Sequence, residues 1–174
     1  MTSTLSIPGP SDVATIISDA GGRIVGRTKL QKMAYFLEAA GLGSGFDFEY
    51  RHYGPYSEDL AAAARLAKFF GQLDEAEAPA TWGGTYSIYT TTQASTNSSD
   101  SRKQLISISA EADSIALELA ATAAFLAAEG HMDPWEETAR RKPEKASPHH
   151  LHSAKELYSS LLKISTPRPL PSIL

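Results

Sequence analysis

Residues 27–40 read Arg-Thr-Lys-Leu-Gln-Lys-Met-Ala-Tyr-Phe-Leu-Glu-Ala-Ala, and this stretch does most to decide the fold. Its apolar residues recur at the three- and four-residue spacing of a helix that buries one face. They are Leu30, Met33, Ala34 and Leu37. The spacing therefore predicts a helix from about Thr28 to Ala40, ended by the glycine-rich residues 41–45. The charged residues off the apolar stripe are Lys29, Lys32 and Glu38.

A second informative stretch follows at residues 46–60, which read Phe-Asp-Phe-Glu-Tyr-Arg-His-Tyr-Gly-Pro-Tyr-Ser-Glu-Asp-Leu. Aromatic and charged residues alternate up to Tyr53, which predicts an extended segment. Gly54-Pro55 is a turn signal. Ser57 is a good N-cap for a third helix that runs to about Phe70. The expected inner face of that helix is Leu60, Ala64, Ala67 and Phe70.

The remaining helices are predicted from caps and apolar spacing. A first helix starts near Ser11 or Asp12 and ends at Gly21-Gly22. A long Ala-rich helix is expected to begin at Ser109 or at the acidic residues after it, and to run to about Glu129. Asp133-Pro134 and Ser147-Pro148 each have the cap-then-proline order that opens a helix.

Two β-prone runs, residues 85–90 and 104–108, are expected to form a hairpin. The Ser-, Thr- and Asn-rich residues 91–101 would form its long polar tip.

These elements predict a mainly α fold with a small β-hairpin, an α+β class. Two or three helices followed by a hairpin form a winged-helix-like layout, and a C-terminal helical part follows it. We expect a single globular domain over residues 1–163. Residues 164–174 hold three prolines and predict an extended tail, either a frayed terminus or a docking peptide for a partner.

The 174 residues have an ordinary globular composition, with 42% hydrophobic and 21% charged residues and a net charge of -4. The charge is uneven, because residues 140–174 carry an excess of Lys and Arg. Such an excess is typical of a solvated face, an acidic partner or nucleic acid. No signal peptide or membrane span is predicted, and we expect a cytoplasmic protein.

The sequence offers little catalytic or cofactor-binding chemistry. It has no cysteine, no nucleophile elbow and no phosphate-binding glycine loop. His149, His150 and His152 cluster in one helical turn, where capping and surface roles are more common than metal binding. We therefore expect no cofactor, no metal and no enzymatic activity, while a small-ligand-binding or enzymatic protein stays an alternative without a named catalytic residue.

A nucleic-acid interface is the main alternative function. The third helix would be the recognition helix of a winged-helix-like DNA-binding regulator. Its phosphate contacts would come from that helix and the hairpin tip, through Arg65, Lys68, Arg102 and Lys103. Glu58 and Asp59 at the start of the helix weaken this hypothesis, because DNA readers carry a dense basic face.

The stretch Thr28-Lys29-Leu30-Gln31-Lys32, together with Tyr53-Gly54-Pro55-Tyr56-Ser57, resembles the paired opening motifs of the Panacea domain family. That family includes SocA-like antitoxins and YwgA-like proteins, and the resemblance covers roughly residues 12–162. It implies a protein that acts by binding another protein. Several members are antitoxins that neutralise a toxin encoded beside them, and one branch presents its toxin to a protease. The resemblance implies no enzymatic activity and no cofactor.

The candidate partner-binding site combines both motifs. Its residues are Lys29, Lys32, Tyr53, Gly54, Pro55, Tyr56 and Ser57. Tyrosines on a rigid turn make good interface anchors, and the two lysines would add a basic edge suited to an acidic segment or a phosphate. The expected partner is a protein, such as a toxin encoded nearby. The competing interpretation is that the tyrosines pack on the second helix of this chain.

Overall fold

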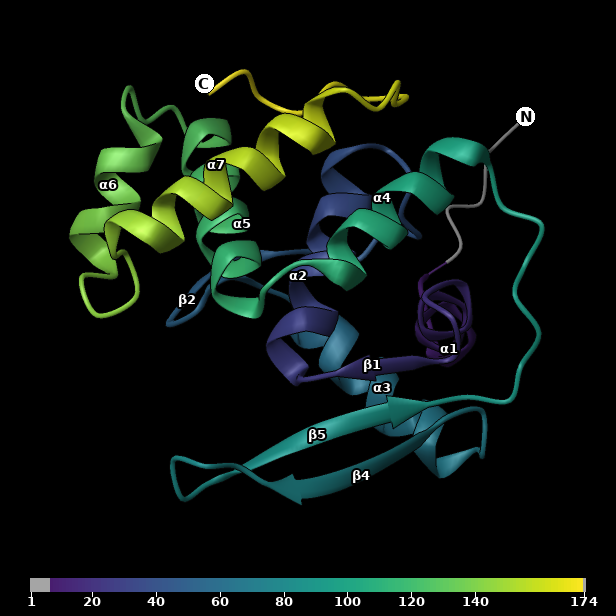
Figure 1. The fold of residues 1–174 in the computed structure, drawn as a ribbon. Helices are drawn as coiled ribbons and strands as arrows, with labels where there is room; N and C mark the ends of the chain where they lie inside the picture. Colours follow the sequence, from purple (N-terminus) through teal and green to yellow (C-terminus); the bar gives the residue numbers. More distant parts are fainter. Residues whose placement is uncertain (1–6, 174) are drawn as a thin grey trace.

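The structure, a computed structural model, describes residues 7–173, and Figure 1 shows a mainly helical α+β fold, as the sequence predicts. Within these residues the elements follow in the order α1 (Pro10–Asp19), β1 (Arg23–Val25), α2 (Arg27–Ala39), β2 (Glu49–Arg51), β3 (Gly54–Tyr56), α3 (Glu58–Phe69), β4 (Asp74–Pro79), β5 (Thr85–Thr90), α4 (Asp100–Glu111), α5 (Ser114–Ala128), α6 (Pro134–Arg141) and α7 (Pro148–Leu162).

The first half has the winged-helix-like order of α1, β1, α2, α3 and a β4–β5 hairpin. The three-stranded antiparallel sheet has the strand order β1-β5-β4, with Ile24 opposite Tyr89 and Ala76 opposite Ile88. In Figure 1 this sheet lies along the lower side of the molecule, with α3 behind it and the other helices above it. A separate two-stranded ribbon, β2–β3, is inserted between α2 and α3. We call β4–β5 the wing and β2–β3 the ribbon.

The second half is built around α5, which is buried on almost every side. Its alanines let α2, α6 and α7 pack closely against it. The predicted stripe of α2 is confirmed, because Leu30, Met33, Ala34 and Leu37 are all buried in the same core. Aromatic rings from α2, α6 and α7 join that core through Phe36, Trp135 and Tyr158.

The predicted hairpin is wrong in one strand. Residues 85–90 do form β5, but its partner is β4, and residues 104–108 belong to α4. β4 reads Asp-Glu-Ala-Glu-Ala-Pro, which has low β propensity, and pairing with β5 overrides it. In α4, Ser99 caps the helix, and Leu105, Ile106 and Ser109 are buried. The polar residues 91–99 are therefore a connection and not a hairpin tip.

Three smaller expectations are also corrected. Gly54 and Pro55 lie inside β3, and the chain reverses before them, between Arg51 and Gly54. The long helix begins at Ser114, where Asp113 caps it, so of the two expected starts the acidic residues after Ser109 are right and Ser109 is wrong. Phe70, expected on the inner face of α3, is 61% exposed.

The proline-rich tail is extended, as predicted, and it contacts the chain's own helices. The Arg168 N–H donates to the Ala40 oxygen at 3.0 Å, and the Trp135 indole N–H donates to the Ile173 oxygen at 2.7 Å. The Tyr158 hydroxyl donates to the Pro171 oxygen, and Leu170 is buried. Through residue 173 the tail is therefore held against the helices by these bonds, with Ile164 and Leu170 buried in the core, and it is not frayed. Across residues 7–173, no helix combines the length and the apolar character that crossing a membrane requires.

Candidate interaction surface

The two opening motifs bind each other across the interior of the fold. On α2, the Gln31 side chain donates to the Ser57 oxygen at 3.0 Å and accepts from the Ser57 N–H at 2.8 Å. The next residue, Lys32, donates from Nζ to the Pro55 oxygen at 2.7 Å. Residues 31–32 thus satisfy the backbone of the ribbon where it leads into α3. Buried backbone groups need such partners, so the two motifs have a structural role.

Lys32 is buried, with 1% of its surface exposed, although the sequence placed it at a surface edge. It lies in a cluster with Glu118, Lys142 and Lys145. The Glu118 carboxylate accepts from Lys142 Nζ at 2.9 Å and from Lys145 Nζ at 2.8 Å. Burial lowers the pKa of Lys32 to about 7, Glu118 partly offsets this, and the two other ammonium groups lower the pKa further. Three lysines around one carboxylate leave an excess of positive charge.

Gly54, Pro55 and Ser57 are buried as well and cannot form an exposed patch. Gly54 has a φ of 89°, and a Cβ atom there would collide with the Thr122 hydroxyl oxygen on α5. Ser57 caps α3, with its side-chain oxygen accepting from the Leu60 N–H at 3.1 Å. These three residues fix where the ribbon ends and α3 begins.

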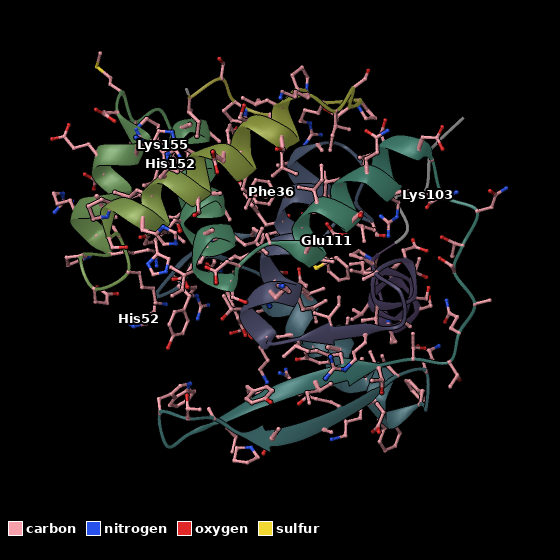
Figure 2. The ribbon with its side chains drawn as sticks, in the orientation of Figure 1. Phe36, His52, Lys103, Glu111, His152 and Lys155 are labelled. Atoms are coloured by element: carbon pink, nitrogen blue, oxygen red, sulfur yellow. The ribbon has the colours of Figure 1, made fainter. Side chains whose placement is uncertain are left out.

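Lys29, Tyr53 and Tyr56 are the accessible part of the predicted site. Lys29 donates from Nζ to the Ala110 and Ala112 oxygens, both at 2.8 Å, and so closes the end of α4. Tyr56 is half-buried beside the Arg51 guanidinium. Tyr53 is 50% exposed, and Lys145 Nζ lies 4.6 Å from the centre of its ring. We call the helices together with the ribbon the helical body. The neighbouring His52 lies on the side of the helical body that faces the wing (Figure 2).

Tyr53 and Lys29 line a groove of about 860 Å³ between the helical body and the wing, which we call the wing groove. Its opposite wall comes from the wing and includes two exposed aromatic residues, Trp82 (76% exposed) and Tyr86 (39% exposed). The charged side chains that line it are Arg27, Lys29, Glu77 and Lys145. The wing groove therefore presents three aromatic rings and three cations against one carboxylate.

The sequence predicted the strand that carries Tyr86 but not the place of Trp82 in the wing wall of this groove. Residues 74–84 were not assigned to a strand, so nothing in the sequence placed Trp82 beside other residues of the groove. The available signal was Trp82-Gly83-Gly84, a turn with a large apolar residue in front of a β-prone run. If residues 85–90 had been paired with residues 74–79 across that turn, Trp82 would have been placed at a hairpin tip.

The nucleic-acid candidates do not gather on one face. Arg102 is turned inward, donating to Asp19 at 3.2 Å and to the Leu42 oxygen at 2.8 Å. Lys103 lies near the start of α4, where Figure 2 labels it, and not on a hairpin tip. Arg65 and Lys68 are exposed on α3, but that helix begins with the exposed acidic residues Glu58 and Asp59.

Other candidate chemistry stays dispersed. Within residues 7–173, no group of three or more His, Cys, Asp or Glu side chains lies close enough together to hold a metal ion. His150 contacts its own cap, Ser147, at 2.9 Å, and His152 lies 3.2 Å from Glu156. Both contacts are local to α7 and fit the surface role that the sequence favoured.

The comparisons with known proteins add one short similarity. No family model and no solved structure matches the chain. A stretch of 39 residues is 49% identical to a DNA ADP-ribosyl glycohydrolase from Thermus aquaticus. That stretch is 22% of this chain and 11% of the relative, so the chain matches about a tenth of that protein's length.

Proposed function

We propose that this chain is a non-enzymatic protein-binding module of the antitoxin or adaptor type, which binds a partner protein in the wing groove and neutralises or presents it. The observation that supports this function best is the set of three exposed rings, Tyr53, Trp82 and Tyr86, around one groove. Exposed aromatic residues in a concave, partly apolar setting are the usual anchors of protein interfaces.

One further point supports a protein partner. The resemblance to Panacea domain antitoxins suggests a toxin encoded beside this chain as the partner. The similarity to the glycohydrolase covers 11% of that enzyme and carries no argument for a partner or a reaction.

DNA binding is the second candidate function, and the winged-helix-like order of elements favours it. Its electrostatics are weak, because α3 starts with Glu58 and Asp59 and ends with the exposed apolar residues Leu66, Phe69 and Phe70. A DNA reader would need cations along this helix to neutralise phosphates. The end of α3 fits an apolar contact better than a phosphate backbone.

The test is co-expression with the product of each gene that flanks this one in the native genome. We expect one product to slow growth alone, and to be neutralised and copurified when this chain is present. A Tyr53→Ala/Trp82→Ala variant should lose both effects. The matched control is Phe70→Ala, which removes an exposed ring outside the wing groove.

Two results would contradict the proposal. One is that no flanking product copurifies while the chain binds duplex DNA with a steep loss of affinity at higher salt, which would support the DNA-binding regulator. The other is that the folded double variant still binds the partner as the wild type does, which would remove the wing groove as the interface.

A further inference from the structure

The edge of β5 that faces the wing groove is open over its first residues. β1 pairs with β5 only from Thr90 back to Ile88, and the last bond on this side runs from the Gly26 N–H to the Ser87 oxygen at 2.8 Å. The chain then turns into α2 at Arg27. Among the described residues, no strand continues the position of β1 beside Thr85.

The pairing register shows which backbone groups this leaves facing the groove. On the other edge, the Ala80 N–H donates to the Gly84 oxygen, and the register places Ala78 opposite Tyr86. In an antiparallel pair, alternate residues bond to opposite sides. The N–H and C=O groups of Thr85 therefore point away from β4 and toward the wing groove, which Thr85, Tyr86 and Ser87 line.

The two walls of the groove differ in charge. On the wall of the helical body, Lys29 and Lys145 stand at the groove. Lys145 shares Glu118 with Lys142, Lys32 lies behind them, and Asp113 is near Lys29, so the lysines outnumber the carboxylates on this wall. On the wing wall, Arg27 is already paired with Glu75 at 3.0 Å and lies 3.8 Å from Glu77. An occupant that carries one acidic group toward the helical body would complement the lysines there and keep that charge away from Glu75 and Glu77.

We propose that the occupant of the wing groove is an extended peptide segment of the partner protein, which pairs as an added strand with the open edge of β5 at Thr85 and places an acidic side chain beside Lys145 and Tyr53. Strand addition at a free sheet edge supplies backbone hydrogen bonds, and pockets beside it select the side chains. Trp82 and Tyr86 flank the added strand. This inference rests on the proposed function and specifies its partner.

A single-stranded nucleic acid would use the same rings and lysines, but the walls favour a peptide. Phosphates along the wing would meet Glu75 and Glu77, which already hold Arg27. A nucleic acid also has no backbone that pairs with the N–H and C=O groups of Thr85. Oligo(dT) is therefore the competing probe in the test.

The probe is a phage-displayed library of random dodecapeptides selected on the wild-type chain. We expect selected sequences with one Asp or Glu among β-branched and aromatic residues. A synthetic copy should bind by fluorescence anisotropy, slow the exchange of the Thr85 amide hydrogen, and bind about tenfold more weakly when its acidic residue is replaced by the matching amide.

Two substitutions at one position test the backbone pairing. Thr85→Pro removes the N–H that faces the groove, at the first position of β5, where a sheet tolerates proline. It should weaken the selected peptide about fivefold to tenfold. Thr85→Val keeps the N–H and should bind within about twofold of wild type, since it loses only a solvent-exposed hydroxyl. Thermal denaturation checks that both variants are folded, and the exchange of the Thr85 amide in the wild type supplies a reading that needs no variant.

The inference is overturned if no dodecapeptide is enriched, if oligo(dT) binds and the peptides do not, or if peptide binding leaves the Thr85 amide exchange unchanged. Its failure can be told from that of the proposed function. If Thr85→Pro still copurifies the partner and Tyr53→Ala/Trp82→Ala does not, the groove remains the interface and strand addition is wrong.

Discussion

The ribbon and the wing are both two-stranded antiparallel hairpins, and they are held in place in opposite ways. The ribbon is fastened from inside the fold, with Lys32 and Lys142 bonded to its backbone and Gln31 bonded to Ser57 directly after it. The tip of the wing, residues 80–84, is closed by its own backbone bonds and carries Trp82 into solvent.

This difference separates residues whose sequence pattern suggests a binding site from residues that are accessible to a partner. Lysines and tyrosines in a tight motif suggested an interface, yet most of that motif holds the ribbon in the core. The plainer wing segment exposes the large rings. Burial of polar side chains is tolerated only when each one finds a partner, and the buried Gln31, Lys32 and Ser57 beside the ribbon all do.

The largest expected effect on the free energy of unfolding comes from replacing Gly54 in the ribbon. Gly83 at the tip of the wing is its matched control. Gly54→Ala should lower the free energy of unfolding by about 3 kcal/mol or more, because it adds backbone strain at positive φ and forces a Cβ onto Thr122. Gly83→Ala, at a φ of 95° with nothing within 4 Å of its Cβ, should cost only about 1 kcal/mol. Urea denaturation measures both.

Equal losses in the two variants would contradict the comparison, since they would mean that the contact with Thr122 adds nothing to the strain. A further control is Thr122→Ala combined with Gly54→Ala. This double variant should recover part of the loss, because it removes the hydroxyl that the new Cβ meets.

The next largest effect is a pH dependence of the free energy of unfolding. It comes from Lys32, which bonds to the backbone of the ribbon. The pKa of Lys32 is lowered from 10.5 to about 7 in the folded protein. Between these pH values the unfolded chain binds more protons than the folded one. The free energy of unfolding should therefore rise with pH above about 7, by up to about 1.4 kcal/mol per pH unit from this group.

Lys32→Met isolates that contribution, because it leaves Glu118, Lys142 and Lys145 in place. We expect the difference in the free energy of unfolding between wild type and variant to shift in favour of wild type as pH increases from 7 to 9. Urea denaturation at several pH values measures this. Parallel pH profiles would show that Lys32 does not change its protonation in this range.

A smaller effect is expected at the cap that links the ribbon to α3. Ser57→Ala removes a buried cap and should cost about 1 kcal/mol of unfolding free energy. The matched cap outside both hairpins is Ser99, which is exposed and accepts from the Arg102 N–H at 3.3 Å. Ser99→Ala should cost about 0.5 kcal/mol, the lower end for such caps. Thermal denaturation of the two variants should rank them in this order, and the reverse ranking would contradict the role given to Ser57.

Helix spacing and caps were readable from the sequence because they are local. The stripe of α2 and the caps Ser57, Asp133 and Ser147 all appear in the structure. The partner of β5 was not readable, because residues 74–79 have little β propensity of their own and pair through a contact that no local rule encodes. Residues 104–108 were predicted as a strand because they are rich in isoleucine, which has high β propensity. They lie in α4, because isoleucine also fits a helix that packs on one side.

The candidate site was predictable only in part. Helical spacing correctly excluded Lys32 from the apolar stripe, but it could not show that a ribbon more than twenty residues later covers that side of α2. Tyr53 was identified because it flanks a turn. Trp82 was missed because its importance depends on the fold, which brings the wing opposite Tyr53.

The smallest expected effect on stability is at the tip of the wing, and it sharpens the comparison most. Trp82→Ala should change the free energy of unfolding by less than about 0.5 kcal/mol, because the ring is 76% exposed. The same change should weaken partner binding by about tenfold or more, as the loss of an aromatic anchor does. Thermal denaturation and the affinity for the copurified partner measure the two quantities on one variant. If Trp82→Ala destabilises the fold as much as Gly54→Ala does, the wing is a structural element like the ribbon, and the argument for a free surface there fails.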